Sequence, residues 1–289
     1  PNVNVAGGTN VDVVYMGLPT QYCSLGAGDD TMVVTASTVP VLSSYGKEGI
    51  DTILTQGGGS FSFVAGIVEF ERLVMQDAAT IDLTQNLQAL DITGSAGADI
   101  VMLGSAGYVG HFGGGNDKVT NGTGNDVLDG GSGFDVFILG PTGGSIDLTV
   151  TGPQDTGQGI DTITNFESAQ GGAGADTIRG DDNPNIINGA GGDDRIFGLG
   201  GDDDLWGASG NDVIDGGAGV DTADYRYVAS GIVVDLSITS GPQVTNDGDG
   251  GQDTLISIEH VSGSPFDDRI TGTPDGDTLG GNAGNDTLR

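Results

Sequence analysis

The chain has very little of three residue types that most proteins of its length use freely. Its 289 residues include one cysteine, Cys23, eight lysines and arginines together, and two histidines. A single cysteine excludes an intrachain disulfide. With a net charge of −33, nucleic acid and anionic membranes are poor partners, and no apolar run is long enough to span a bilayer. A bound metal is one device that can replace disulfides in stabilising such a fold.

Glutamate is also scarce, although the chain is strongly acidic. Among 41 acidic residues the glutamates are Glu48, Glu69, Glu71, Glu167 and Glu259. A helical chain that needed negative charge would favour glutamate, which is the better helix former. Aspartate combined with 56 glycines indicates turns, and turns rich in short carboxylates indicate a hard cation.

Motifs that would carry catalysis are absent from the sequence. It contains no His-Glu-x-x-His zinc helix and no Gly-x-Ser-x-Gly nucleophile elbow. His111, His260 and Cys23 do not cluster in sequence, which disfavours zinc. Aspartate pairs recur throughout, so they are no evidence for acid–base chemistry. We predict that this chain is not an enzyme.

What the sequence does contain is a nine-residue repeat. From Gly171 to Asp224 it divides without a gap into GGAGADTIR, GDDNPNIIN, GAGGDDRIF, GLGGDDDLW, GASGNDVID and GGAGVDTAD. An earlier array starts at Gly94 and a third at Gly263, while single units begin at Gly46, Thr156 and Gly248. Each unit opens with turn-forming residues and closes with a short strand that carries one inward apolar side chain.

These units resemble the RTX (repeats-in-toxin) nonapeptide Gly-Gly-x-Gly-x-Asp-x-U-x, in which U is apolar. The resemblance covers the three arrays and the single units. It implies an all-β fold of parallel β-roll, or β-solenoid, arrays joined by β-rich linkers. It also implies several Ca²⁺ ions, held by turn carbonyls and by the carboxylates of the sixth position. The aspartates that match this position are Asp99, Asp117, Asp126, Asp135, Asp176, Asp194, Asp203, Asp212, Asp221, Asp268, Asp277 and Asp286.

The repeats predict six segments. They are a degenerate RTX-like β segment (1–93), a first β-roll (94–140), a β linker (141–170), a second β-roll (171–224), a second β linker (225–262) and a third β-roll (263–289). We expect the third roll to continue in a longer protein. A longer period overlies the repeats, because GIDTIT at Gly159 and GQDTLI at Gly251 lie 92 residues apart.

Two units make one coil, so aspartates eighteen residues apart should stack about 4.8 Å apart. Without an ion, each neighbouring pair would repel by about 1 kcal/mol in water and about 3–4 kcal/mol at an effective dielectric near 20. Calcium–oxygen bonds of about 2.3–2.6 Å let one ion touch oxygens of both turns, whereas magnesium, at about 2.1 Å, fits poorly. The alternative is a metal-free solenoid whose aspartates face solvent.

Some positions depart from the repeat. Tyr108 and Asn185 stand where the sixth-position aspartate is expected, which removes a carboxylate from each row. Asp51, Asp161 and Asp253 belong to single units with no repeat neighbour eighteen residues away. These three residues could lie in turns that end strands or could bind calcium, and the sequence leaves both alternatives open.

The predicted core is thin, because each nine-residue unit points one apolar side chain inward. The predicted inward residues are Val101, Val119, Val127, Phe137, Ile178, Ile187, Ile196, Leu205, Ile214, Ile270, Leu279 and Leu288. So little burial gives marginal stability, and metal affinity then becomes folding free energy. We therefore expect an expanded chain without calcium and a β-rich chain with it.

Taken with the resemblance, these features predict a secreted or bacterial cell-surface calcium-binding module. In the resembled family, calcium-poor cytoplasm keeps the chain unfolded for type I export, and external calcium folds it. We expect a structural role, as in an S-layer, filament or adhesin, with self-assembly or a cell-surface polysaccharide as the partner. The alternative is an accessory C-terminal calcium-binding module of a secreted protease, lipase, lyase, alginate epimerase or toxin.

Overall fold

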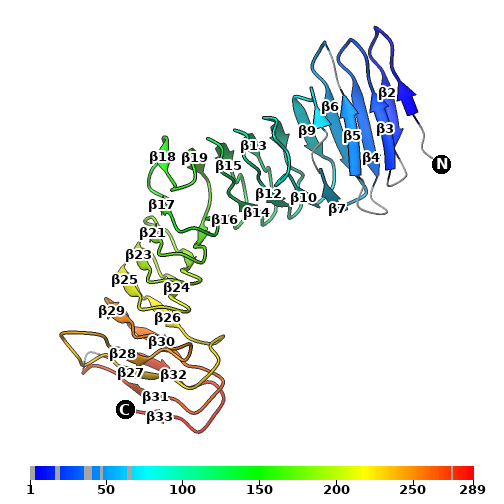
Figure 1. Ribbon diagram of the computed structural model, residues 1–289. Helices are drawn as coiled ribbons and strands as arrows, with labels where there is room; N and C mark the ends of the chain where they lie inside the picture. Colours follow the sequence, from blue (N-terminus) through cyan, green and yellow to red (C-terminus); the bar gives the residue numbers. More distant parts are fainter. Residues whose placement is uncertain (1–3, 17–19, 36–40, 46–47, 64–66, 275) are drawn as a thin grey trace. The chain divides into compact units, whose positions relative to one another are not determined.

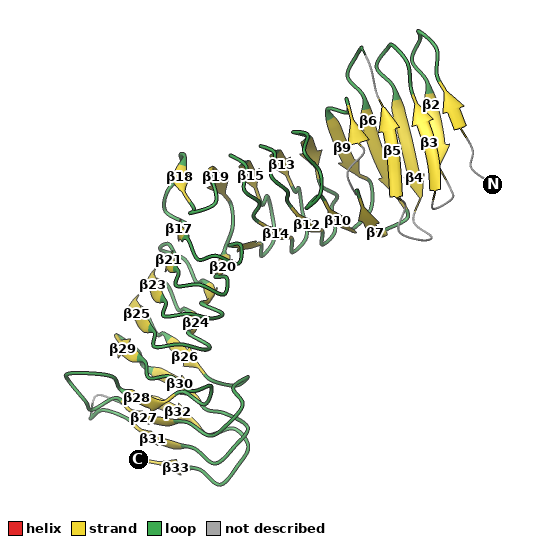
Figure 2. Cartoon of the chain, in the orientation of Figure 1, coloured by secondary structure: helices red, strands yellow, loops and turns green. Residues whose placement is uncertain are grey.

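The computed structural model describes residues 4–16, 20–35, 41–45, 48–63, 67–274 and 276–289. Across these residues every regular element is a β-strand and no helix is present, which confirms the all-β prediction (Figure 2). A helix able to cross a membrane is accordingly not found in the described part of the chain. The degenerate repeat Met16–Ser24 and the unit that opens at Gly46 lie partly outside it. The chain forms two compact units, residues 1–137 with 151–166 and residues 138–150 with 167–289.

The first unit is a stack of parallel coils whose successive strands lie side by side (Figure 1). One sheet contains β1 (Asn4–Ala6), β3 (Thr20–Ser24), β5 (Val41–Tyr45) and β8 (Ile67–Val68). A second contains β2 (Val13–Met16), β4 (Thr31–Thr35), β6 (Thr52–Gln56), β9 (Arg72–Met75), β11 (Asp91–Thr93), β13 (Val109–His111), β15 (Val127–Asp129), β19 (Ile160–Thr164) and β18 (Gln154–Asp155). Opposite it run β7 (Gly59–Ser62), β10 (Ala79–Asp82), β12 (Ile100–Met102), β14 (Lys118–Thr120) and β16 (Val136–Ile138).

The second unit repeats this architecture with three sets of strands. The first set is β17 (Ser145–Asp147), β21 (Thr177–Arg179), β23 (Arg195–Gly200), β25 (Val213–Ala218) and β29 (Thr254–Ile256). The second is β20 (Ser168–Gln170), β22 (Ile186–Asn188), β24 (Asp204–Trp206), β26 (Thr222–Asp224), β30 (His260–Ser262) and β32 (Thr278–Gly280). The third is β28 (Val244–Asn246), β27 (Val233–Asp235), β31 (Arg269–Thr271) and β33 (Thr287–Leu288).

Insertions in the repeat loop out of the coils without ending them. β29 pairs in parallel with β25, and β19 pairs in parallel with β15, although long segments separate the partners in sequence. The antiparallel pairs β18–β19 and β27–β28 belong to these insertions. The segments that the sequence marks as linkers therefore contribute strands to the same kind of parallel stack as the repeats.

The core of each unit is a ladder of apolar side chains in register. Ile178 pairs with Ile196, which pairs with Ile214, and all three are fully buried. Nine of the predicted inward residues are fully buried in this way: Val101, Val119, Phe137, Ile178, Ile187, Ile196, Leu205, Ile214 and Ile270. Leu279 is half-buried, and Leu288 is 44% exposed because its strand, β33, is the outer one of its sheet.

The prediction for Val127 is wrong. Val127 is 46% exposed, whereas its neighbour Leu128 is fully buried. Successive side chains of a strand point to opposite faces, so only one of the two can face inward. Leu128 holds the eighth position of its unit, as Val119 does in the unit before it.

Replacing Leu128 by alanine should destabilise the calcium-loaded chain by about 2–5 kcal/mol, because it empties a buried site in the ladder. The adjacent Val127→Ala substitution is the control, and its exposed side chain should change stability by no more than about 0.5 kcal/mol. Urea unfolding in saturating calcium measures both. Equal losses would show that the two side chains share the core.

Candidate metal centre

Sixth-position aspartates stack into rows that backbone hydrogen bonds hold in register. The N–H of Asp99 donates to Asp117 Oδ1 at 2.8 Å, and the N–H of Asp117 donates to Asp135 Oδ1 at 2.7 Å. The same link joins Asp176 to Asp194, Asp194 to Asp212, Asp203 to Asp221 and Asp268 to Asp286. Every member except the half-buried Asp286 is at most 3% exposed. The structure thus brings together the rows that the eighteen-residue spacing predicts.

The three single units also join rows, contrary to the expectation that they lack stacked neighbours. The N–H of Asp30 donates to Asp51 Oδ1 across 21 residues of sequence. Asp126 is linked to Asp161 across 35 residues, and Asp212 to Asp253 across 41. Separation along the chain differs from separation along the stack because the insertions loop out.

Two glutamates extend the rows, and sequence reasoning missed both. Glu71 Oε2 accepts the N–H of Asp51 at 2.8 Å, and Glu259 Oε2 accepts the N–H of Asp221 at 3.0 Å. A signal was available, because each follows an apolar residue at a matched place in the longer repeat, in a chain with few glutamates.

The two departures from the repeat take different roles. Tyr108 is 1% exposed, and its hydroxyl donates to the carbonyl of Asn86 at 3.2 Å, so it packs in the core. Burial raises the pKa of this phenol. The backbone N–H of Asn185 donates to Asp203 Oδ1 at 2.8 Å. Its side-chain oxygen accepts the N–H of Asp181, and its side-chain amide donates to the carbonyl of Glu167 at 3.0 Å. Neither position supplies a carboxylate.

In one class of turn, which we call closed, Oδ2 of the sixth-position aspartate accepts a hydrogen bond from the protein backbone. The N–H of the second residue of the unit donates to Oδ2 of the sixth, as from Ser95 to Asp99 at 2.8 Å and from Gly172 to Asp176 at 2.7 Å. The closed turns are those of Asp12, Asp99, Asp176, Asp268 and Asp277. Asp99, Asp176 and Asp268 are each the first sixth-position aspartate of an array.

In the other class, which we call open, the second residue has a positive φ, and its N–H does not reach the carboxylate. Ala190, Leu199 and Ala208 take φ values of 73°, 78° and 65°, a conformation uncommon for residues other than glycine. In six turns of this class, Oδ2 of the sixth-position aspartate is buried and has no hydrogen-bond partner among the described residues, and these six are the turns that we call open below. These aspartates are Asp30, Asp117, Asp194, Asp203, Asp212 and Asp221. Asp126 Oδ2 is left in the same state.

Burial makes these carboxylates costly to ionise. It raises the pKa of Asp117, Asp203 and Asp212 to about 6, and that of Asp126, Asp194 and Asp253 to about 7. Charges of neighbouring row members raise these pKa values further, as Asp212 and Asp176 do for Asp194. At neutral pH, fully ionised rows therefore need a compensating cation.

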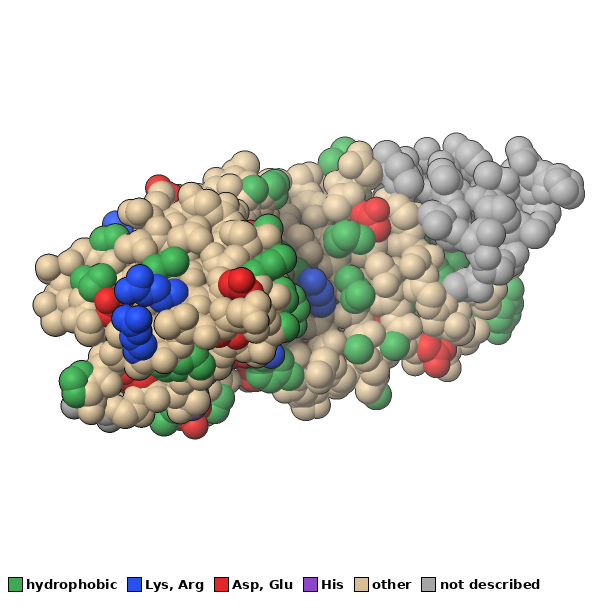
Figure 3. Space-filling model, turned by 90° about the horizontal axis from the view of Figure 1, so that it is seen from below, with side chains coloured by type: hydrophobic (Ala, Val, Ile, Leu, Met, Phe, Trp, Pro, Cys, Tyr) green, Lys and Arg blue, Asp and Glu red, His purple; other side chains and the backbone are tan. Residues whose placement is uncertain are grey.

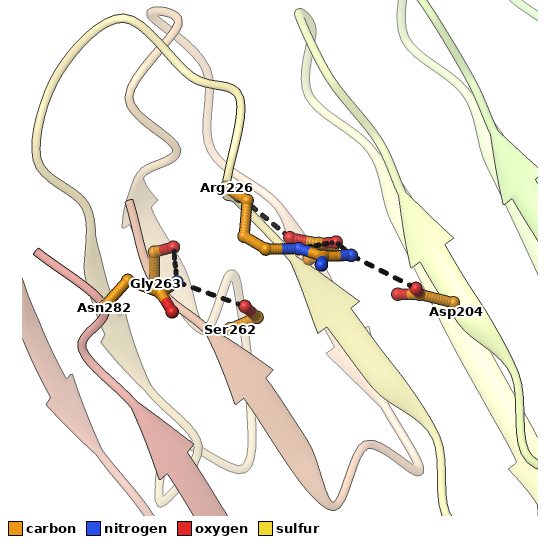
Figure 4. A network of polar contacts seen from close by, with 6 residues as sticks. Asp204, Arg226, Ser262, Gly263 and Asn282 are labelled. Carbon is orange, nitrogen blue, oxygen red and sulfur yellow. Dashed lines mark hydrogen bonds and ion pairs between the residues drawn. The ribbon is translucent and has the colours of Figure 1, made fainter. Parts of the chain in front are cut away.

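Two arginines, Arg179 and Arg226, form ion pairs with aspartates that are not row members. Arg226 pairs with Asp224 and with Asp204, the latter at 3.4 Å (Figure 4). Arg179 Nε lies 3.1 Å from Asp147. On the face shown in Figure 3, carboxylates are sparse and scattered, in keeping with the burial of the row aspartates. Local charge compensation is thus the role of these arginines.

The donor set of the rows consists of oxygen atoms. Nowhere in the described ranges do three carboxylate, imidazole or thiol side chains form a metal cluster, so backbone carbonyls would have to complete a shell of six to eight oxygens. Glycine brings the turns close enough for this. A Cβ on Gly210 would lie 1.8 Å from the carbonyl oxygen of Gly192, and one on Gly219 would lie 1.8 Å from that of Gly201. One carboxylate per turn with stacked carbonyls suits calcium rather than zinc.

Comparison with known proteins agrees with this donor set. The family model of the RTX calcium-binding nonapeptide repeat matches in four copies, at residues 113–138, 170–205, 188–223 and 258–289. These segments contain the open turns of Asp117, Asp194, Asp203, Asp212 and Asp221. No curated protein matches the chain.

Proposed function

The chain carries RTX calcium-binding nonapeptide repeats folded as a β-roll, and we propose that it is an extracellular structural module whose coils fold as calcium fills the open turns. The observation that carries this proposal is the set of buried Oδ2 atoms without a hydrogen-bond partner in the described structure. A buried carboxylate oxygen in that state costs free energy unless a cation engages it. Calcium supplies the missing charge and accepts carbonyl oxygens as its other ligands.

The ligands we propose are the sixth-position aspartates, with the open turns as the main sites. In closed turns, Oδ2 already accepts a backbone N–H. We therefore propose that the closed turns of Asp99, Asp176 and Asp268 begin their rows and fix the register of the coils. Asp51, Asp161 and Asp253 continue rows and are further candidates.

An extracellular location is supported by the chemistry of the rows. Weak sites of one carboxylate and several carbonyls suit the millimolar calcium found outside cells. We propose a structural rather than catalytic role, such as surface assembly, because stacked coils present long regular faces to partners. Calcium-dependent polymers, seen by light scattering or electron microscopy, would support assembly. A strictly monomeric calcium form would contradict it.

The two classes of turn can be told apart by paired substitutions within one row. Asp194→Asn should remove one bound calcium ion or weaken it about tenfold, because it takes charge from an open turn while keeping the oxygen that accepts the N–H of Asp176. Calorimetric titration with ion counting measures this.

The matched control is Asp176→Asn in the closed turn. Both oxygens of Asp176 accept backbone N–H groups. Asparagine would replace one of these oxygens by an NH₂ group, which is a donor and would face the N–H of the backbone. We expect a stability loss of about 1–3 kcal/mol with an unchanged ion count. Loss of an ion in both variants, or in neither, would contradict the division into open and closed turns.

A further inference from the structure

The sheet that contains β22, β24 and β26 carries a second column of side chains on the face opposite its core ladder. Leu205 and Ala223 are paired neighbours in β24 and β26, and both are fully buried. Successive side chains of a strand point to opposite faces, so the next residues, Trp206 and Asp224, face away from the ladder. Asn188 of β22 is in register with Trp206. An amide, an indole ring and a carboxylate therefore lie in successive coils on one face.

This column borders a cavity of about 300 Å³. Its lining includes Asn188, Trp206 and Asp224, together with Tyr227 and Asp249 from the segments that follow β26 and β28. All of these residues belong to the second compact unit. The volume is at the lower end of the range of small-molecule sites, so the cavity suits a ligand of about one ring.

Two aromatic rings supply the apolar part of the lining. Tyr227 is 80% exposed, and its ring centroid lies 6.5 Å from that of Trp206, with 38° between the ring planes. The guanidinium of Arg226 lies over the Tyr227 ring, 5.8 Å from its centroid, and Asp224 accepts the Nε–H of Arg226 at 2.6 Å. The exposed ring is thus held by its neighbours, so little side-chain freedom is lost when a ligand stacks on it.

Polar groups of the lining keep hydrogen-bonding capacity for a ligand. Asn188 Oδ1 accepts the N–H of Ala190 at 2.9 Å, which leaves the side-chain amide as a donor. Asp249 is exposed, and its Oδ1 accepts the N–H of Ala229 at 2.9 Å, which leaves Oδ2 as an acceptor. Trp206 Nε1 is buried without a partner among the described residues, although a buried indole N–H usually has one. The lining thus joins donors and an acceptor to an apolar surface.

The charges around the cavity disfavour ionic ligands. Among the described residues, its lining contains the carboxylates of Asp224 and Asp249 and no lysine or arginine, in a chain of net charge −33, so an anion would be repelled. A cation stacked on Tyr227 would meet the guanidinium of Arg226 that already lies over the ring. A neutral ligand with an apolar face and several hydroxyl groups fits best.

We propose that this cavity binds a neutral sugar ring. A pyranose presents C–H groups on its faces and hydroxyl groups around its rim. The C–H face packs on the rings of Tyr227 and Trp206, where stacking buries apolar surface. The hydroxyl groups, which both donate and accept, bond to the Asn188 amide and to the Asp249 carboxylate.

One wall of the cavity belongs to a calcium turn. Ala208 lines the cavity, and its φ of 65° belongs to the open turn of Asp212. Calcium in this turn fixes the wall, and in this respect the inference rests on the proposed function. It deepens that function by naming the partner of the module as a neutral saccharide, of the kind that a surface polysaccharide presents.

Tyr227→Ala tests the site, because it removes an exposed ring and no core side chain. Trp206 is the single tryptophan of the chain, so its fluorescence reports on this cavity. In saturating calcium, titration with methyl glycosides of neutral hexoses and of N-acetylhexosamines should change this emission, with a Kd of about 1 mM for at least one of them. Tyr227→Ala should weaken that sugar at least about tenfold, whereas Tyr227→Phe, which keeps the ring, should bind like wild type.

The matched control is Tyr15→Ala, which removes a tyrosine that is 72% exposed in the first unit and should leave the affinity unchanged. Saturation-transfer NMR on the same sugars checks the fluorescence result, and circular dichroism in calcium checks that each variant is folded.

The outcomes separate this inference from the proposed function. A calcium-folded wild-type chain that binds no sugar of the panel overturns the sugar site alone, and so does sugar binding that Tyr227→Ala leaves intact. Choline or glucuronate bound in preference to the neutral sugars also overturns it, because charge would then decide recognition. A chain that binds no calcium and is folded in chelator overturns the proposed function, and the sugar titration then still decides what the cavity binds.

Discussion

Removing calcium should convert the chain from a β-rich fold to an expanded, largely disordered one. Each coil buries few apolar side chains, so hydrophobic burial stabilises the fold only weakly. Repulsion between ionised aspartates opposes folding by about 1–4 kcal/mol per neighbouring pair. Calcium cancels this repulsion and couples its binding energy to folding. Far-UV circular dichroism during a calcium titration of chelator-treated protein should show a cooperative gain of β structure.

Magnesium is the control for this experiment. It prefers shorter bonds and rigid octahedral coordination, so it should give much less folding at equal concentration. A circular dichroism spectrum that is β-rich in excess chelator, and unchanged by calcium, would contradict the proposed coupling. Equal effects of the two ions would point to general charge screening instead of specific sites.

Acid should partly replace calcium. The ordinary carboxyl pKa of 3.8 rises to about 6 for Asp203 and Asp212 in the fold, and to about 7 for Asp194 and Asp253. The folded state therefore binds protons more tightly than the unfolded chain. This contribution to stability is complete below the unfolded pKa and is lost as pH rises through the folded values. In chelator, β structure should increase as pH falls from about 8 to about 5.

Circular dichroism and sedimentation in chelator at each pH measure this effect, with sedimentation separating folding from aggregation. The Asp194→Asn variant serves as the comparison, because it lacks one of the groups that take up protons and should gain less on acidification. A loss of β structure between pH 8 and 5, or no change, would contradict the linkage.

Both predictions depend on the rows, and the rows were predictable because the nine-residue period is regular. Because two units make one coil, residues eighteen apart lie on the same side of successive coils. The repeat alone therefore stacks Asp176, Asp194 and Asp212. The same regularity places Ile178, Ile196 and Ile214 in register inside. The error at Val127 concerns a single step along a strand, which exchanges the two faces.

The membership of the rows could not be predicted where the period is broken. Asp126 meets Asp161, and Asp212 meets Asp253, only after an insertion of unpredictable length has looped out of the stack. The spacing of residues in the sequence does not indicate at which residue the chain rejoins the stack after such a loop. Nor does it indicate that Glu71 and Glu259 can stand in for aspartate, since their longer side chains reach the same N–H from a different backbone position.

The sequence by itself determined the parallel coil, the position of the rows and their all-oxygen chemistry, because a short exact repeat of glycine, aspartate and an aliphatic residue permits few other arrangements. Only the tertiary structure decided which turns are open. That depends on the backbone φ of Ala190, Leu199 and Ala208, residues whose side chains give no sign of a left-handed conformation. The stacking of Asp253 next to Asp212 was likewise decided by where the insertion rejoins the coil, since the two residues are 41 positions apart in sequence.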